Sequence, residues 1–188
     1  MNTDLSRYIS NEIELKNGQH LILRKPNIED AEKIIEYLNL VGGESDNLLF
    51  GKDKFRFNVV QEIEYIKNIS NDPNTLIILG LMDSNIVGCA SISNPSIERI
   101  AHNSEVAISV KKDYWRNGIG NAIMEELIRV VKEHDTIKNI GLGVNASNQN
   151  AITMYEKFGF EKVGVHKDYF KINGNYVDEI LMDLYIKS

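Results

Sequence analysis

The chain has 188 residues, of which 43% are hydrophobic and 26% are charged, and its formal net charge is −6. This length suits a single domain, and the composition is typical of a soluble globular protein. The acidic balance argues against nucleic acid as a partner, because phosphate binding requires a basic surface. The single cysteine, Cys89, excludes an internal disulfide, and no Cys/His spacing indicates a metal site.

The N-terminal sequence MNTDLSRYIS has neither the basic nor the apolar region of a signal peptide. The longest apolar run, TLIILGLM, is far too short to span a bilayer, which needs roughly 20 residues. These features predict a cytoplasmic protein in a reducing compartment, without a membrane partner. Cys89 lies in the apolar run IVGCASI, so we interpret it as a buried small hydrophobe and not as a nucleophile.

The first half of the chain predicts a hairpin, two helices and a pair of strands. In chain order these are the hairpin (12–25), the helices (26–43 and 59–70) and the antiparallel strands (74–82 and 85–94). Asn17-Gly18 is a strong hairpin signal between two short strand patterns. Asn27 is a suitable N-cap for the first helix, and Gly42-Gly43 is expected to end it.

The second half of the chain predicts four more strands and two more helices. In chain order these are a strand (104–110), a helix after Gly118–Gly120, a strand (138–144), a helix (148–158) and two strands (160–172 and 176–186). Gly159 is a helix-ending glycine, and Asn173-Gly174 marks the last hairpin. We therefore expect an α/β (α+β) chain whose mixed, mostly antiparallel sheet is flanked by about four helices, in one domain over residues 1–188.

The stretch DYWRNGIGNAI, residues 113–123, places a Gly-x-Gly turn between a strand and a helix. Such a turn aims backbone N–H groups and the positive end of the helix at one point, which favours an anion site, although glycines needed only for tight packing give the same pattern. A Walker A loop, and hence a phosphate-loop kinase, requires Lys-Ser/Thr where Asn121 follows Gly120. A dinucleotide fingerprint requires a small residue where Ile123 stands. Once these two loops are excluded, the candidate that remains for an anion site is a phosphate-binding loop of another type.

Two segments resemble the GCN5-related N-acetyltransferases (GNAT). Residues 110–128, VKKDYWRNGIGNAIMEELI, resemble the motif whose loop wraps the pyrophosphate of coenzyme A, and residues 145–160, NASNQNAITMYEKFGF, resemble the second motif of that family. Trp115 stands where the loop pattern has Arg or Gln, which is similar to the branch of ribosomal-protein and spermidine acetyltransferases. The resemblance covers nearly the whole chain and implies the GNAT fold, with strands four and five splayed.

The resemblance implies acetyl-CoA as the cofactor and carries its contacts onto named positions. The implied cofactor-binding residues are Ile108, Val110, Arg116, Asn117, Gly118, Ile119, Gly120, Asn121 and Asn148. Of these, Asn148 also suits a plain helix N-cap, and both roles can hold at once. Lys111, Lys112 and Arg116 would supply local positive charge in an acidic protein.

The same resemblance implies two catalytic residues. Glu105 matches a carboxylate that collects the proton of the amine, commonly through water, although a surface strand residue would look the same. Tyr155 matches the proton donor to the coenzyme A thiolate, although it would also suit a core position. With ordinary pKa values that transfer is uphill by about 2 kcal/mol, so Tyr155 either meets a desolvated thiolate or acts mainly as a hydrogen-bond donor.

The acceptor pocket should be bounded by residues 44–57 and the last hairpin. Its candidate walls are Phe50, Phe55, Tyr169 and Tyr176, and Asp178 and Glu179 could meet a cation, although aromatic residues in such places often serve only packing.

The function expected is acetyl transfer from acetyl-CoA to a primary amine, either a small molecule or a peptide N-terminus, by direct attack. The alternative is a non-catalytic module that binds coenzyme A. A homodimer is possible by resemblance.

Overall fold

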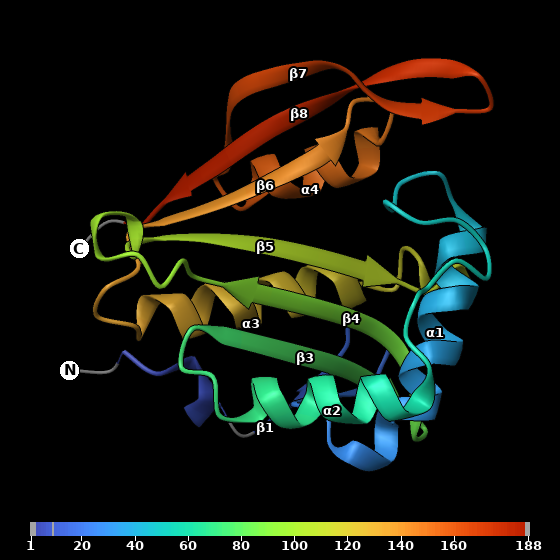
Figure 1. Cartoon of the computed structure of the whole chain (residues 1–188), viewed down its shortest axis with the longest axis vertical. Coiled ribbons are helices and arrows are strands. Elements are labelled where there is room, and N and C mark those ends of the chain that lie inside the picture. The colour runs from blue at the N-terminus through green and yellow to red at the C-terminus, as the bar shows by residue number, and fades with distance from the viewer. Residues whose placement is uncertain (1–2, 9, 187–188) are drawn as a thin grey trace. The chain divides into compact units, whose positions relative to one another are not determined.

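The computed structural model describes residues 3–8 and 10–186 (Figure 1). The chain divides into two compact units. Unit 1 comprises Met1–Ser93 and Ala107–Asp135, and unit 2 comprises Asn94–Val106 and Thr136–Ser188. Strand β5 (Asn103–Val110) is divided between them, because its first half belongs to unit 2 and its second half to unit 1.

The helices and strands follow the order that the sequence predicts. Unit 1 contains β1 (Ser10–Glu14), β2 (His20–Arg24), α1 (Ala31–Glu44), α2 (Val59–Ser70), β3 (Thr75–Met82), β4 (Asn85–Ser93) and α3 (Ile119–Lys132). Unit 2 contains β6 (Asn139–Asn145), α4 (Gln149–Lys157), β7 (Glu161–Ile172) and β8 (Asn175–Tyr185). Short 3-10 turns are η1 (Leu5–Arg7), η2 (Ile28–Asp30), η3 (Glu98–Ile100) and η4 (Lys112–Tyr114).

The strands are hydrogen-bonded in the order β1-β2-β3-β4-β5-β6-β8-β7. The β1–β2, β2–β3, β3–β4, β6–β8 and β7–β8 pairs are antiparallel, and β5 pairs with β6 in parallel. The register of that parallel pair runs from Asn103 opposite Asn139 to Glu105 opposite Gly141. The mixed, mostly antiparallel sheet with four α-helices is thus confirmed.

Unit 1 has helices on both faces of its strands. Successive residues of a strand point to opposite faces, so Leu79 and Gly80 of β3 meet different neighbours. Leu79 belongs to a buried cluster with residues of α1 and α2. A Cβ at Gly80 or Gly88 would instead lie 3.4 or 2.7 Å from the Cδ1 atom of Ile123, so α3 packs closely on the other face. Figure 1 shows α2 in front of β3 and α3 behind the strands.

Unit 2 is built on a long hairpin. Strand β8 lies between β6 and β7 in the hydrogen-bonded order, and β7 and β8 meet at Asn173-Gly174 with φ of 50° and 85°. Helix α4 ends where Gly159 takes φ of 91° and the N–H of Phe160 donates to the carbonyl of Tyr155 at 3.1 Å. Both turns need the left-handed conformations that Asn and Gly adopt most readily, so the sequence predicts them correctly.

One predicted boundary is wrong. Gly42 and Gly43 were expected to end the first helix, but α1 continues through both to Glu44. A Cβ at Gly42 would lie 2.7 Å from the carbonyl oxygen of Gly51, so this glycine permits a later loop to approach the helix. The expected N-cap is confirmed, because Asn27 and Asp30 form a capping box at η2, directly before α1. Among the described residues, no helix is long and apolar enough to cross a membrane.

Candidate functional site

The glycine turn of unit 1 is built from two left-handed residues at the start of α3. Arg116 has φ of 65°, and Gly118 has φ of 84° and serves as the N-cap without a side-chain hydrogen bond. The first intrahelical bond runs from the N–H of Ala122 to the carbonyl of Gly118 at 2.9 Å. The N–H groups of Ile119, Gly120 and Asn121 therefore have no acceptor within the helix. We call residues Arg116–Asn121 the glycine loop.

The side chains of the glycine loop leave its backbone accessible. Arg116, Asn117 and Asn121 are exposed, and a Cβ added at Gly118 would meet no atom within 4 Å. Ile119 differs from the others because its side chain is buried in the core, so only its backbone is available to a ligand. Free N–H donors at the positive end of a 14-residue helix, next to open space, suit a diphosphate.

Trp115, which departs from the family pattern, helps to hold the segment of chain that leads from β5 into the glycine loop. Its indole N–H donates to the carbonyl of Val110 at 2.7 Å, so the side chain folds back on the end of β5. The Lys112 ammonium lies 6.0 Å from the centre of the indole ring. The backbone N–H of Lys112 donates to the Glu44 carboxylate at 2.7 Å, and that of Lys111 to the carbonyl of Val87 at 2.9 Å. These contacts hold the segment between β5 and α3.

Ile108 and Val110 are half-buried residues in the second half of β5. Between them, the hydroxyl of Ser109 lies 3.0 Å from that of Tyr37 on α1 and 3.4 Å from the carbonyl of Cys89. Burial raises the pKa of the Cys89 thiol to about 12, which keeps it protonated and unreactive. Cys89 is half-buried and not fully buried as expected, but it packs against the buried cluster that includes α1 and α2, which supports its interpretation as a packing residue.

In unit 2, Asn148 and Tyr155 belong to α4. Asn148 is the N-cap, and its side-chain oxygen accepts from the N–H of Ala151 at 3.2 Å. The cap expected from the sequence is confirmed, and the amide nitrogen of the same side chain is a further donor. Because Tyr155 follows by seven residues, close to two helical turns, both residues lie on the same side of α4.

The Tyr155 side chain is buried against Phe160, with ring centres 5.6 Å apart. Burial raises the pKa of Tyr155 to about 12, so its hydroxyl remains protonated across the physiological range. A full proton transfer from this phenol to a thiolate of ordinary pKa would be uphill by about 5 kcal/mol. The buried tyrosine is therefore suited to donate a hydrogen bond rather than to release its proton.

Glu105 has an exposed side chain on the half of β5 that belongs to unit 2. Its backbone pairs with Gly141 of β6. Exposure suits an exchange of protons with water, and it equally suits a surface residue, so its catalytic role stays a prediction.

The predicted walls of the acceptor pocket fall in both units. In unit 1, Phe50 and Phe55 contact each other with ring centres 6.0 Å apart. In unit 2, Tyr169 stacks on His166 at 5.5 Å, and Tyr176 lies 5.5 Å from the Lys171 ammonium. Each residue thus has a local packing partner, and none of these contacts tests a role in substrate binding.

Asp178 and Glu179, the expected partners of a cation, both have contacts on the hairpin. Asp178 accepts from the backbone N–H of Asp168 at 2.9 Å, and Glu179 lies 2.9 Å from Nδ1 of His166. A Cβ at Gly143 would collide with the Glu179 carboxylate, so this glycine makes room for it.

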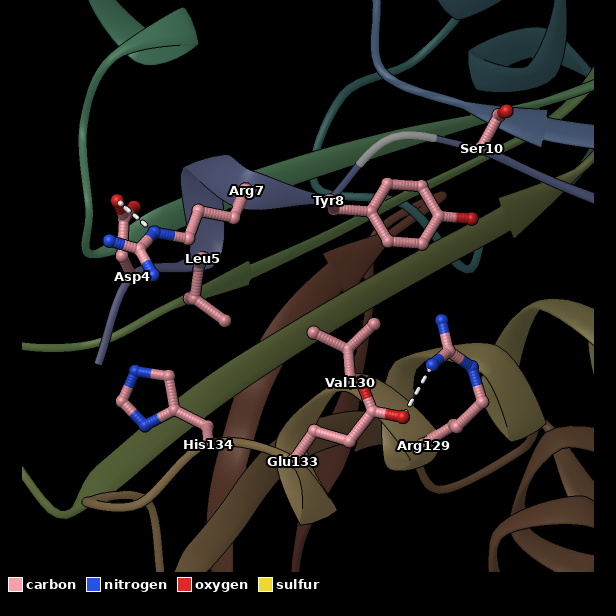
Figure 2. A pocket seen from close by; sticks show the side chains of 9 residues that line it. All are labelled: Asp4, Leu5, Arg7, Tyr8, Ser10, Arg129, Val130, Glu133 and His134. Carbon is pink, nitrogen blue, oxygen red and sulfur yellow. Dashed lines mark hydrogen bonds and ion pairs between the residues drawn. The ribbon is translucent and has the colours of Figure 1, made fainter. Parts of the chain in front are cut away.

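A polar pocket of about 240 Å³ lies in unit 1 between η1 and the C-terminal end of α3 (Figure 2). Its charged walls pair with each other: Arg7 lies 3.4 Å from Asp4, and Arg129 lies 2.6 Å from Glu133. None of the predicted site residues lines this pocket.

Sequence reasoning passed over Glu62 on α2, whose side chain is only 3% exposed. The available signal was a charge at an apolar position of the helical repeat, because Ile66 follows it by four residues and is also buried. Its Oε2 atom has no hydrogen-bond partner.

Comparison with known proteins identifies the family. The model of the acetyltransferase (GNAT) family matches residues 47–160, more than half of the chain. An L-amino acid N-acetyltransferase of Escherichia coli K12 is 29% identical over 116 residues, covering 62% of this chain and 72% of the relative. A [ribosomal protein bS18]-alanine N-acetyltransferase of the same organism is 35% identical over 77 residues, covering 41% of this chain and 51% of the relative.

A solved structure extends the similarity to the whole fold. An acetyltransferase of the GNAT family from Streptococcus pneumoniae superimposes with a TM-score of 0.84 at 26% identity, covering 88% of this chain and 99% of that one. The glycine loop and helix α4 lie wholly within the segment that the family model matches. The chain belongs to the acetyltransferase (GNAT) family, as its two motifs predict.

Proposed function

We propose that the acceptor of this acetyl-CoA-dependent N-acetyltransferase is a primary α-amino group, on an amino acid or at a peptide N-terminus. Membership of the acetyltransferase family supports acetyl transfer as the reaction and acetyl-CoA as the cofactor. The α-amino acceptor is supported by the two relatives, whose names specify an L-amino acid and an alanine of a ribosomal protein. The non-catalytic alternative is not favoured, because those relatives are named as enzymes.

The glycine loop is proposed to hold the diphosphate of the cofactor. The N–H groups of Gly118, Ile119, Gly120 and Asn121 would donate to phosphate oxygens, and the dipole of α3 would favour the negative charge. This assignment rests on the uncapped helix start and on the open space beside Gly118. Arg116 and Asn117 would add side-chain donors, and their exposure leaves them free to turn toward a ligand.

The remaining cofactor contacts are proposed by family resemblance. The backbone N–H groups of Ile108 and Val110 would face the pantetheine arm and the acetyl oxygen. The side-chain nitrogen of Asn148 would donate to the cofactor while its oxygen caps α4. Acetyl-CoA supplies the activated acetyl thioester, and these residues orient it.

Two side chains are proposed to handle protons during direct attack. A primary amine is mostly protonated at neutral pH, so Glu105 would accept its proton, directly or through water. Tyr155 would donate a hydrogen bond to the departing sulfur, which stabilises negative charge without full loss of the phenolic proton. The N–C bond would form as the C–S bond breaks, and the second proton that the nitrogen loses would pass through solvent to the departing thiolate, so that coenzyme A leaves as the free thiol.

Other features of the function also remain proposals. Phe50, Phe55, Tyr169 and Tyr176 are kept as candidate walls for the acceptor side chain. A cytoplasmic location, a homodimer and the absence of nucleic-acid and membrane partners are expectations from sequence alone.

The decisive experiment measures thiol release from acetyl-CoA with a thiol-reactive dye across a panel of amines. The panel contains free amino acids, short peptides, a polyamine and the same peptides with a blocked N-terminus. We expect one equivalent of thiol per acetylated amine, with none from the blocked peptides. Acetyl-CoA binding by calorimetry without thiol release from any amine would instead support the non-catalytic module.

A further inference from the structure

The sequence contains three Asn-Gly pairs, at residues 17–18, 117–118 and 173–174, and only the second lies in the glycine loop. In such a pair the side-chain amide of the asparagine can react with the backbone nitrogen of the glycine, because glycine has no side chain to hinder the approach. Asparagine counts among the thermolabile residues of proteins. The pairs differ in how firmly hydrogen bonds hold the reacting groups.

The reacting groups of the first pair are all held by hydrogen bonds. Nδ2 of Asn17 donates to Oε1 of Gln19 at 2.7 Å, and Oδ1 of Asn17 accepts from the N–H of Gln19 at 3.1 Å. The N–H of Gly18 donates to the carbonyl of Leu15 at 2.8 Å. Ring closure at this pair would break all of these bonds, so we expect the pair to be stable.

The pair in the glycine loop has none of these restraints. Asn117 is exposed, and among the described residues neither its side chain nor the N–H of Gly118 has a hydrogen-bond partner. Gly118 contributes only its carbonyl to α3, by accepting from the N–H of Ala122 at 2.9 Å. A Cβ at Gly118 would meet no atom within 4 Å, so the space beside the pair is open. The amide carbon of Asn117 is therefore free to approach the nitrogen of Gly118.

We propose that Asn117 is a deamidation site whose conversion disables the glycine loop, and that a bound cofactor prevents this conversion. The backbone nitrogen of Gly118 loses its proton to a base in the solvent and attacks Cγ of Asn117. The N–Cγ bond forms, the Cγ–Nδ2 bond breaks, and the departing amide nitrogen takes up a proton and leaves as ammonia. Water then opens the cyclic imide at either of its carbonyls, which leaves aspartate or isoaspartate at position 117.

The effect on cofactor binding rests on the function proposed above, in which the glycine loop holds the diphosphate. Either product places a negative charge directly before the N–H donors of the loop, where it would repel the phosphates. Isoaspartate also lengthens the main chain and redirects the N–H groups that follow. The N–H of Gly118 is both the attacking group and a proposed donor to the diphosphate. A bound cofactor therefore occupies the atom that starts the reaction, and only the empty enzyme deamidates.

The test incubates the wild-type enzyme at mildly alkaline pH, with and without coenzyme A, and follows each Asn-Gly pair by peptide mass mapping. We expect Asn117 to convert faster than Asn17 by about tenfold or more, because the hydrogen bonds of Asn17 must break first. Coenzyme A at about ten times its Kd should slow the conversion of Asn117 about tenfold, because only the unbound fraction reacts. Asn173, on the hairpin of unit 2, should convert at the same rate with and without coenzyme A.

Calorimetry measures the effect on cofactor binding without an acceptor amine. The aged enzyme should retain sites for acetyl-CoA in proportion to its unconverted Asn117, and Asn117→Asp should raise the Kd by about fivefold or more. Asn117→Gln, compared with its own fresh sample, should keep its binding on ageing, because the longer side chain cyclises far more slowly. Asn173→Gln is the matched control and should lose binding as fast as the wild type.

The inference would be overturned if Asn117 converted no faster than Asn17, or equally fast with and without coenzyme A. Constant affinity for acetyl-CoA while Asn117 is converted would also overturn it. If the wild-type enzyme acetylates amines and Asn117 persists, only this inference fails. If the enzyme acetylates no amine, the proposed function fails, and the mass map and the calorimetry still decide on Asn117 separately.

Discussion

At the scale of single residues, Gly118 is the position at which the proposed binding of the cofactor can be tested most directly. Its left-handed φ of 84° admits other residues only with strain, and the space where a Cβ would point is open. Gly118→Ala should therefore cost about 1–2 kcal/mol of folding stability through backbone strain. It should also weaken acetyl-CoA binding by tenfold or more, measured by calorimetry, because the methyl group would occupy the approach of the diphosphate.

Gly18 provides a matched control for that substitution. It has φ of 80° and equally open surroundings, but it lies in the β1–β2 turn. Gly18→Ala should show a similar loss of stability with unchanged affinity for acetyl-CoA. Equal affinities in both variants would contradict the assignment of the diphosphate to the glycine loop.

Tyr155 allows a second test at this scale. Because burial raises the pKa of its phenol to about 12, the donor form persists throughout the usable pH range. We expect Tyr155→Phe to lower kcat by about 100-fold with little change in acetyl-CoA affinity, since one donor to a developing charge is lost. The wild-type profile of kcat against pH should show no decline from this group below about pH 10. The control Tyr185→Phe, at an exposed tyrosine of unit 2, should retain wild-type kcat. A large loss of affinity at constant kcat would refute the role of Tyr155.

At the scale of elements, the backbone of Gly51 lies close to Gly42 of α1, and the sequence of the helix alone does not predict this contact. Gly42→Ala should lower folding stability by about 1–3 kcal/mol in urea unfolding, although alanine favours helix, because the new Cβ would meet the backbone of Gly51. Gly43→Ala should cost less, since its nearest neighbours are side-chain atoms of the exposed Lys52. If Gly42→Ala were more stable to urea than the wild type, the loop at Gly51 would be able to move away from the new Cβ at little cost, and the prediction would be wrong.

The elements also show which features the sequence predicts. The turns at Gly18 and at Asn173-Gly174 and the cap at Asn27 are local, and each is fixed by residues a few positions apart. The role of the glycine pair in α1 is not local, because Gly42 and Gly43 permit the approach of residues 51 and 52 and do not end the helix. The glycine loop and the residues of α4 were found from their motifs. Glu62 was missed because its isolation is a property of the packed structure and not of its neighbours in sequence.

At the scale of the whole molecule, the prediction of one domain over residues 1–188 remains to be tested by unfolding. The single tryptophan, Trp115, reports on unit 1, whereas circular dichroism reports on the helices and strands of both units. If the chain folds as one domain, the two signals should follow one urea transition with the same midpoint. Separate midpoints would reveal two independently folding parts.

The route of the backbone through the two units limits how this enzyme can be divided. The chain leaves unit 1 after Ser93, returns at Ala107 and leaves again after Asp135. A gene fragment ending at Asp135 would encode all of unit 1, but it would also contain Asn94–Val106, which belongs to unit 2. The complementary fragment would lack that piece, which supplies the only partner strand recorded for β6 besides β8. Split-enzyme designs for this protein should therefore place their break within a single unit, at an exposed turn such as Asn173-Gly174, rather than at a boundary.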